Sequence, residues 1–250
     1  MIRTHKLSCS FGSHLAVDSL DLELEAGELF GLLGPNGAGK TTTMRMLVGL
    51  LPPTRGQAYV GGFDVENQPI EVKRTVGYLP QSPMVYEFLS GREFLLFYGG
   101  LFGLDDSEIE ASVTTLVEQL GLADDLDREV GGYSGGMRQK LALCAALIHQ
   151  PRVLILDEPL AGLDPISART VKDLLRQRCQ QGDLVLLSTH ILEVAERVCD
   201  RVGILHRGRL AAVGTVDELR HMRRGRYDQS LEDIFLELTR DEQLSQALEG

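Results

Sequence analysis

The sequence predicts an α/β fold in which a mainly parallel sheet forms the core, with antiparallel strands before it and a helical segment inserted into it. Three observations lead to this prediction. Strand patterns alternate with helical ones in the second half of the chain, residues 1–27 alternate as half-exposed strands do, and a long run between them has helical spacing. Strands that alternate with helices are typical of a parallel sheet with helices on its faces.

The N-terminal part of this fold is predicted from three short segments. Residues 20–25 alternate apolar and polar side chains, which is the period of a half-exposed antiparallel strand, and Ala26-Gly27 follows as a turn. Residues 29–33 predict a buried strand. A glycine-rich turn then leads into residues 40–47, which have helical spacing. This helix should end before Pro52, because proline cannot continue a helix.

The middle of the chain changes from strand to helix patterns. Residues 56–78 predict further short strands with a glycine turn at Gly61-Gly62. From about residue 82 to residue 150, apolar residues recur every three or four positions, most clearly in residues 108–120 and 137–148. We therefore expect an α-helical subdomain at about residues 82–150, inserted into the core.

The second half of the chain returns to strand patterns. Residues 153–156, 184–188 and 202–206 are compact and apolar, and polar helical stretches separate them. They predict the parallel strands of the core. We expect one domain over residues 1–240, followed by a C-terminal tail at residues 241–250.

Composition narrows the classes of function. The 250 residues, 43% of them hydrophobic, suffice for a sizeable core. The net charge of -11 argues against non-specific nucleic-acid binding, which needs a basic field, so we expect no nucleic-acid partner. The four cysteines form no C-x-x-C pair, which favours a reducing cytosol over a disulfide framework or a zinc site. Because no apolar run reaches the roughly 18 residues of a membrane span, we expect a cytoplasmic chain.

A phosphate-binding motif lies between the predicted strand at 29–33 and the predicted helix at 40–47. Residues 34–41 fit G-x-x-x-x-G-K-[ST], whose glycines let backbone N–H groups approach a phosphate at a helix start. Lys40 is placed to reach the β- and γ-phosphates, and the Thr41 hydroxyl to bind Mg²⁺. A glycine turn that only caps a helix is the weaker alternative in this strand–helix context. The motif predicts a P-loop NTPase core in which ATP is bound by Gly34, Pro35, Asn36, Gly37, Ala38, Gly39, Lys40, Thr41 and Thr42.

Two acids follow the predicted strand at 153–156. In a parallel sheet the loops after the strands face the ligand, so Asp157 and Glu158 are expected near the phosphates. Asp157 is placed to hold the Mg²⁺ shell, and Glu158 to polarise the attacking water as a general base. An acidic turn with no role in catalysis is the alternative, and the phosphate loop makes it the weaker one.

A second motif stands at the head of the apolar helix predicted at 137–148. Ser134-Gly135-Gly136 resembles the core of the ABC signature, whose usual form is Leu-Ser-Gly-Gly-Gln, although Tyr133 and Met137 replace its outer residues. The resemblance implies that these residues contact the ATP held by another subunit. Ser134 is equally well placed to be the N-cap of the helix, and both interpretations can hold.

The remaining elements of the ABC family appear in the family's order over about residues 1–240. By this resemblance Gln81 is the Q-loop glutamine, which senses Mg²⁺ or water, and Asp164 lies in the D-loop. His190 resembles the catalytic switch histidine, and Phe11 the aromatic residue that stacks on adenine. Each also has a plainer interpretation when taken singly: Gln81 as a loop residue, His190 as a polar strand end, and Phe11 as a core aromatic.

The resemblance also implies partners and cofactors. ATP and Mg²⁺ are the expected cofactors, bound at the interface with a second ATPase subunit, which is expected to be an identical chain. A separate transmembrane permease is expected to hold the chain at the cytoplasmic face of the plasma membrane. The stretch after Gln81, with Pro83, Met84, Tyr86 and Phe88, resembles the segment that docks such a permease, and core of the helical subdomain is its alternative interpretation.

The variant signature, the D-loop and the tail at 230–239 together resemble the ABC-2 group, whose members are commonly exporters. Two rival functions fit the sequence less well. An ABC ATPase acting on DNA or ribosomes is disfavoured, since the chain has no long heptad insertion, cysteine cluster or second cassette. A P-loop kinase is disfavoured by the signature and His190. The transported cargo and the role of the basic cluster at 220–226 stay open, although a solvated face is favoured for that cluster.

Overall fold

The computed structural model describes residues 1–222 and 231–236, and its centre is a six-stranded sheet. The strand order is β10-β9-β3-β8-β7-β6, in which β9, β3, β8, β7 and β6 are parallel and β10 is antiparallel to β9. This arrangement confirms the predicted mainly parallel core. The strands are β3 (Leu29–Leu33), β6 (Val76–Leu79), β7 (Val153–Asp157), β8 (Leu184–Thr189), β9 (Arg201–His206) and β10 (Arg209–Gly214).

A four-stranded antiparallel sheet precedes and flanks this core, with the order β2-β1-β4-β5. Its first two strands pair from Ile2 opposite Leu24 to Phe11 opposite His14. Burial alternates strictly over residues 20–24, as the half-exposed pattern predicted. The strands are β1 (Ile2–Phe11), β2 (His14–Leu24), β4 (Arg55–Val60) and β5 (Phe63–Asp64).

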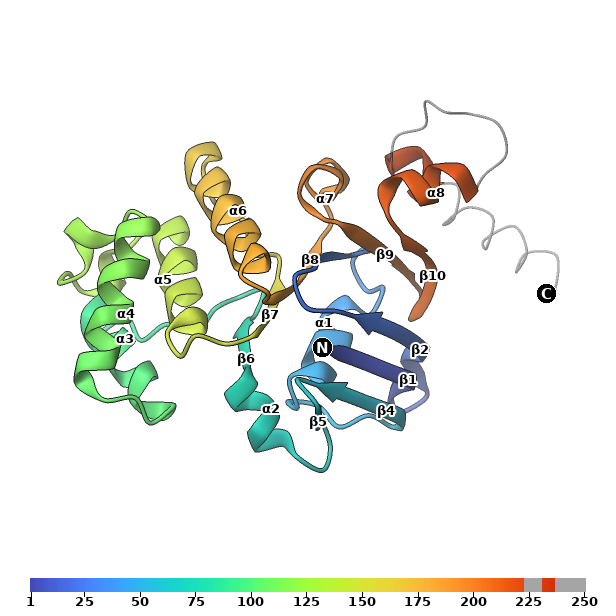
Figure 1. The fold of residues 1–250 in the computed structure, drawn as a ribbon, viewed down its shortest axis with the longest axis horizontal. Helices are drawn as coiled ribbons and strands as arrows, with labels where there is room; N and C mark the ends of the chain where they lie inside the picture. Colours follow the sequence, from blue (N-terminus) through green and yellow to red (C-terminus); the bar gives the residue numbers. More distant parts are fainter. Residues whose placement is uncertain (223–230, 237–250) are drawn as a thin grey trace.

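Three helices follow β6 and precede β7 in sequence, and they gather at the end of the molecule opposite to the antiparallel sheet (Figure 1). The helices α3 and α4 begin at capping boxes formed by Ser90 with Glu93 and by Asp105 with Glu108. They are α3 (Gly91–Leu101), α4 (Asp106–Gln119) and α5 (Gly135–Leu147), with short 3-10 turns η1 (Ala123–Asp125) and η2 (Val130–Gly132) between α4 and α5.

Two features of the fold were not predicted. Helix α2 (Pro69–Thr75) interrupts residues 56–78, where only strands were expected. Pro69 at the first helical position and Glu71 in the first turn suit a helix start, and they outweigh the strand-like composition around them. The antiparallel strand β10 also extends the core sheet beyond the last predicted strand.

The two faces of the six-stranded sheet pack against different layers. Phe30 and Ile155 belong to a core shared with α1 and the four-stranded sheet, whereas Leu29 and Leu154 belong to a core shared with α5, α6 and α7. Adjacent residues therefore face opposite cores, which explains why these strands are continuously apolar. The helices beside the core are α1 (Lys40–Leu47), α6 (Pro165–Gln180), α7 (Leu192–Val198) and α8 (Val216–Met222).

Some expectations for the C-terminus fall beyond the described residues. These are the tail at 241–250, most of the basic cluster at 220–226, and part of the segment at 230–239. Within the described residues, no helix combines the length and the apolar character needed to cross a membrane.

Candidate nucleotide-binding site

The phosphate loop at residues 34–39 connects β3 to α1, as the motif predicted. Its glycines are required by close backbone approach. A Cβ on Gly34 would lie 2.3 Å from the Leu205 carbonyl oxygen, and one on Gly39 would lie 2.5 Å from that of Ala16. Gly39 also has a φ of 106°, which side chains rarely adopt. The loop thus packs closely against strand β9 of the core sheet and strand β2 of the antiparallel sheet.

Lys40 is the first residue of α1 and lies beneath this loop. Its side chain is buried, and Nζ donates to the Gly34 carbonyl at 2.6 Å and to that of Pro35 at 3.2 Å. Burial lowers the pKa of the Lys40 ammonium, while Glu158 and Asp157 oppose that shift. The loop and the two acids hold a cation where the motif requires one.

A pair of oxygen ligands stands beside the loop. The Thr41 hydroxyl donates to the Asp157 carboxylate at 2.6 Å, and the buried Ser188 hydroxyl donates to the other oxygen of that carboxylate. Asp157 ends strand β7, as predicted. A hydroxyl and one carboxylate suit Mg²⁺, which prefers oxygen ligands and usually takes the rest of its shell from phosphates and water. Thr41 and Asp157 therefore fit the metal that the sequence predicts.

Glu158 combines burial with an unusual backbone. Its side chain is buried, and its φ of 53° lies in the left-handed region, which non-glycine residues seldom occupy. Its backbone N–H donates to the Ser188 hydroxyl at 3.0 Å, and Gln139 Nε2 donates to its carbonyl at 3.4 Å. Its Oε1 lies 2.9 Å from Nδ1 of His190, whose side chain is 60% exposed. The carboxylate is thus held between the core and an accessible imidazole.

Two of these supporting residues were missed in the sequence. Ser188 links Asp157 to Glu158, and Gln139 donates to the carbonyls of Glu158 and Pro159. The position of Ser188 on the strand beside β7 is a signal that sequence reasoning can use. Gln139 offers no such signal, because its contact depends on how helix α5 packs against the turn after β7.

Most of the residues predicted to bind ATP and Mg²⁺ line a cavity of about 360 Å³, whereas Gly34 and His190 do not line it. Phe11 lines it and is 51% exposed, so its interpretation as a core aromatic is wrong. Gln81 also lines it, from an exposed bend after β6. His14 and Ala16 were not predicted. The complete lining consists of Phe11, His14, Ala16, Pro35, Asn36, Gly37, Ala38, Gly39, Lys40, Thr41, Thr42, Gln81, Asp157 and Glu158.

The signature residues stand apart from this cavity's lining. Ser134 is the N-cap of α5 and accepts from the Met137 N–H at 3.2 Å, which confirms the capping interpretation. Ser134 and Gly135 are exposed. The D-loop comprises residues 161–165. A Cβ on Gly136 would lie 3.3 Å from the Gly162 carbonyl oxygen, so the signature lies against the D-loop of its own chain.

Asp164 of that D-loop caps helix α6. Its carboxylate accepts from the backbone N–H groups of Ile166 at 2.9 Å and Ser167 at 3.0 Å. The hydrogen bonds from Ser167 hold the pKa of this carboxyl below its usual value. Within one chain, Asp164 therefore caps α6, and this fixes the direction in which the chain enters α6 from the D-loop.

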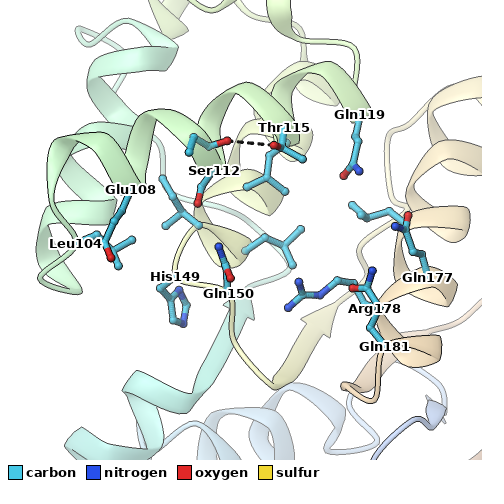
Figure 2. A pocket seen from close by; sticks show the side chains of 15 residues that line it. Leu104, Glu108, Ser112, Thr115, Gln119, His149, Gln150, Gln177, Arg178 and Gln181 are labelled. Carbon is cyan, nitrogen blue, oxygen red and sulfur yellow. Dashed lines mark hydrogen bonds between the residues drawn. The ribbon is translucent and has the colours of Figure 1, made fainter.

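A larger cavity of about 680 Å³ lies between α4 and α6 (Figure 2). Polar side chains from both helices face it, among them Glu108 and Ser112 from α4 and Gln177 and Arg178 from α6. No residue of the phosphate loop lines it. The smaller cavity is therefore the candidate nucleotide site, because its lining includes the lysine, the hydroxyl and the carboxylates that phosphates and Mg²⁺ require.

The fold and the smaller cavity together define a P-loop NTPase. The sequence profile of the ABC transporter family matches residues 17–161. An uncharacterized ABC transporter ATP-binding protein of Bacillus subtilis, YxlF, is 41% identical over 220 residues, which are 88% of this chain and 72% of YxlF. The linearmycin resistance ATP-binding protein LnrL of Bacillus subtilis is 35% identical over 219 residues, 88% of this chain and 70% of LnrL. A solved ATP-binding subunit of an ABC transporter superposes with a TM-score of 0.89 at 33% identity, covering 96% of this chain and 99% of that one.

The chain belongs to the ABC transporter family and is an ATP-binding subunit of an ABC transporter. It is an ATPase, and its cofactors are ATP and Mg²⁺.

Proposed function

We propose that the chain works as a dimer of two identical subunits, arranged head to tail around two ATP-Mg²⁺, and that it drives a separate transmembrane permease. One observation carries the proposal. The phosphate cavity contains Lys40 and Glu158 but no signature residue, while Ser134 and Gly135 stand exposed at the start of α5. A helix start presents unpaired N–H groups that suit a γ-phosphate. A second subunit supplies that phosphate if each signature covers the other chain's cavity.

The arrangement of the acids and the histidine supports a role for each in hydrolysis. Lys40 would bind the phosphates, and Thr41, Asp157 and Gln81, which line the same cavity, would hold Mg²⁺. Mg²⁺, when bound, neutralises charge on the phosphates. Glu158 would accept the proton of the attacking water, and His190 orients Glu158 through the 2.9 Å contact. By its resemblance to the switch histidine of the family, His190 is also expected to contact the γ-phosphate. Asp164 places the D-loop at the subunit interface.

The surface for the permease is proposed at the segment after Gln81. Met84 is 87% exposed and Phe88 is 75% exposed, so these two side chains are not core of the helical subdomain. The Tyr86 ring centroid lies 5.9 Å from that of Phe88 and 5.6 Å from that of Phe97 on α3. Large exposed apolar side chains that gather in one place are typical of an interaction surface. We name Met84, Tyr86 and Phe88 the docking patch.

Export by an ABC-2 permease at the plasma membrane is the transport process that the relatives favour. LnrL is a resistance protein by name, and this chain aligns with 70% of it. The cargo depends on the permease and is not encoded in the residues of the nucleotide site.

Cross-linking tests the shared site directly. We propose the double variant Asn36→Cys, Ser134→Cys, because both positions are exposed and Gly37 beside Asn36 has a φ of 81° that disfavours a cysteine there. The four native cysteines are buried, so they do not compete. Oxidation with ATP should give a covalent dimer, and oxidation without nucleotide should not. The control pair Asn36→Cys, Gly100→Cys places the second thiol on an exposed position of α3 and should stay monomeric. A double variant that stays monomeric with ATP would contradict the shared site.

A further inference from the structure

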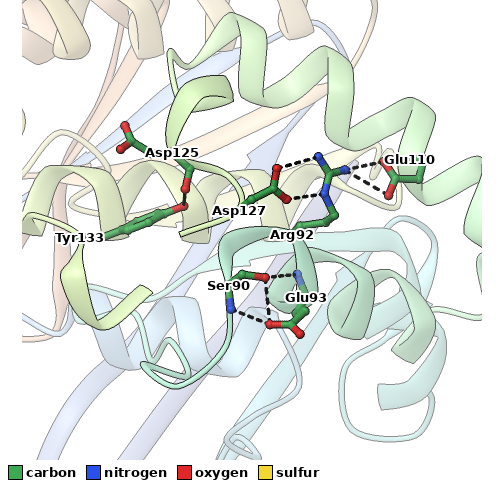
Figure 3. A network of polar contacts seen from close by, with 7 residues as sticks. All are labelled: Ser90, Arg92, Glu93, Glu110, Asp125, Asp127 and Tyr133. Atoms are coloured by element: carbon green, nitrogen blue, oxygen red, sulfur yellow. Dashed lines mark hydrogen bonds and ion pairs between the residues drawn. The ribbon is translucent and has the colours of Figure 1, made fainter. Parts of the chain in front are cut away.

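Tyr133 is the signature-motif residue whose role the nucleotide chemistry does not explain. It stands where the family's usual form has leucine, directly before Ser134, and is only 4% exposed. Its hydroxyl is not left unpaired in the interior. It donates to the Asp125 carbonyl at 2.6 Å, and that carbonyl also accepts from the Arg128 N–H at 3.0 Å (Figure 3). The far end of the ring is therefore attached to the η1 turn.

The ring also meets the first turn of α3 at a position that only glycine suits. A Cβ on Gly91 would lie 2.5 Å from the Tyr133 hydroxyl oxygen and 3.0 Å from the Leu126 carbonyl oxygen. A contact of 2.5 Å is shorter than a side-chain carbon makes in proteins. The Tyr133 hydroxyl therefore occupies space that is open only because residue 91 is glycine. Leucine, which is shorter and apolar, makes neither the hydrogen bond nor this contact.

Polar contacts fix the turn against which Tyr133 packs. Arg92 bridges Asp127 at 2.7 Å and Glu110 of α4 at 2.8 Å, and the Ser90–Glu93 capping box closes the start of α3 (Figure 3). These contacts are partly exposed, so each alone stabilises little. Their combined effect is to hold the first turn of α3 in one place relative to α4 and the loop before the signature.

Backbone hydrogen bonds join the loop before Ser134 to the residues that precede α3. The Gly131 N–H donates to the Glu87 carbonyl at 2.8 Å, and the Val130 N–H donates to the Leu89 carbonyl at 2.8 Å. Glu87 also pairs with Arg138 of α5 at 2.9 Å. The loop that leads into Ser134 is thus hydrogen-bonded to residues 87–89, at the end of the docking patch. Tyr133 makes the last of the loop's contacts before Ser134.

We propose that Tyr133 is a positioning residue, which through its hydrogen bond to Asp125 and its fit over Gly91 sets the place of Ser134 for contact with the partner's ATP. This inference rests on the proposed shared site and deepens it. The hydrogen bond acts at the far end of a rigid ring, so it restricts rotation of the Tyr133 backbone, and Ser134 follows directly in the chain. Losing it loosens the signature without touching the phosphate loop.

Dimerisation in the Glu158→Gln background tests the proposal, because that variant is expected to hold ATP without turnover. Tyr133→Phe keeps the ring and removes the hydrogen bond. It should weaken ATP-dependent dimerisation, measured by analytical ultracentrifugation, by roughly tenfold, because each of the two signatures is then less ordered before the chains meet and must be ordered on association. ATP affinity at protein concentrations where the chain is monomeric should not change. Tyr98→Phe removes a hydroxyl from a partly buried tyrosine of α3 and should leave dimerisation unchanged.

A double-mutant cycle separates this fit from general packing. Gly91→Ala should weaken dimerisation by itself, because its methyl meets the Tyr133 hydroxyl, and should cost much less when combined with Tyr133→Phe. Gly100→Ala, on the same helix with open space around it, is the matched control and should be neutral. Additive effects, unchanged dimerisation in Tyr133→Phe, or loss of ATP binding by the monomer would each contradict the positioning role. A Glu158→Gln parent that stays monomeric with ATP would contradict the proposed function, and this inference with it.

Discussion

At the scale of single residues, Glu158 combines a strained backbone conformation with several of the polar contacts of the site. Glu158 has a left-handed backbone, lines the cavity and contacts His190 through its carboxylate, while Ser188 and Gln139 bind its backbone. Backbone strain of this kind is kept in proteins where a side chain must point in a set direction. The local geometry therefore agrees with a general base.

Glu158→Gln should slow ATP hydrolysis by about 10²–10⁴-fold while ATP binding is retained. Glutamine keeps the shape of the side chain and loses the basic oxygen. Steady-state hydrolysis and equilibrium binding of ATP-Mg²⁺ measure the two effects separately. Ser188→Ala is the companion variant: it should reduce turnover less, because it only loosens Asp157 and Glu158. Rapid turnover by Glu158→Gln would assign the base to another group.

His149 predicts a pH dependence of stability that is independent of catalysis. Burial lowers the pKa of His149 to about 4 from 6.5, with a smaller contribution from the Arg178 charge. Its Nε2 lies 3.2 Å from the Val76 carbonyl oxygen, its ring stacks on Phe102 at 3.6 Å, and its buried Nδ1 has no hydrogen-bond partner in the described part of the chain. Between pH 6.5 and 4 the unfolded chain therefore binds a proton that the folded chain does not.

The stabilisation that neutral His149 provides is complete above pH 6.5 and is lost as the pH falls toward 4. His149→Asn, which does not titrate there, should be less stable than wild type at pH 7. This difference should shrink by about 2 kcal/mol by pH 4.5 in urea unfolding. His5→Asn, at an exposed position of β1, controls for the loss of an imidazole. A constant difference across this range would contradict the buried neutral state.

At the scale of elements, the starts of helices α1 and α5 carry the two halves of the proposed site. Helix α1 begins at Lys40 under the phosphate loop, and α5 begins after Ser134 on the exposed surface. The first start lines the candidate nucleotide cavity of its own chain. The second faces outward and is held by the loop that Tyr133 attaches to η1.

Much of this arrangement was predictable from sequence, for physical reasons that differ between elements. Apolar strands followed by glycine or acid are local signals, so β3, β7 and the loops after them were placed correctly. Helix α2 was missed because a short helix with one buried residue has little periodicity to detect. The contacts of Ser188, Gln139 and Tyr133 depend on tertiary packing, which no local pattern encodes.

The docking patch gives a prediction at this scale. Tyr86→Ser with Phe88→Ser should release the chain from membranes that contain its permease, because two large apolar contacts are lost from one surface. ATP binding should be retained, since neither side chain lines the nucleotide cavity. Membrane flotation and nucleotide binding measure the two effects. Ile70→Ser, which changes a similarly exposed apolar residue on α2, is the control and should stay bound. Retention of the double variant on membranes would place the docking surface elsewhere.

At the scale of the whole molecule, the two halves of the proposed active site lie on different parts of one chain. The phosphate loop, Asp157 and Glu158 line one cavity, and the signature is exposed next to the D-loop. In the proposed dimer, two chains related by a two-fold axis present each half to the other, which makes two equal sites. By this proposal ATP holds the closed dimer together, and hydrolysis releases it.

Complementation between two inactive variants tests this central claim most directly. Lys40→Ala removes the cation that contacts the phosphates, and Ser134→Arg blocks the signature with bulk and charge, so each homodimer has two damaged sites. After subunit exchange in the reconstituted permease complex, a mixed dimer collects both lesions in one site and keeps the other site intact. About half of the dimers are then mixed, so ATP hydrolysis should recover to at most about a quarter of the wild-type rate. Mixed dimers verified by mass that remain as inactive as their parents would contradict a site shared between subunits.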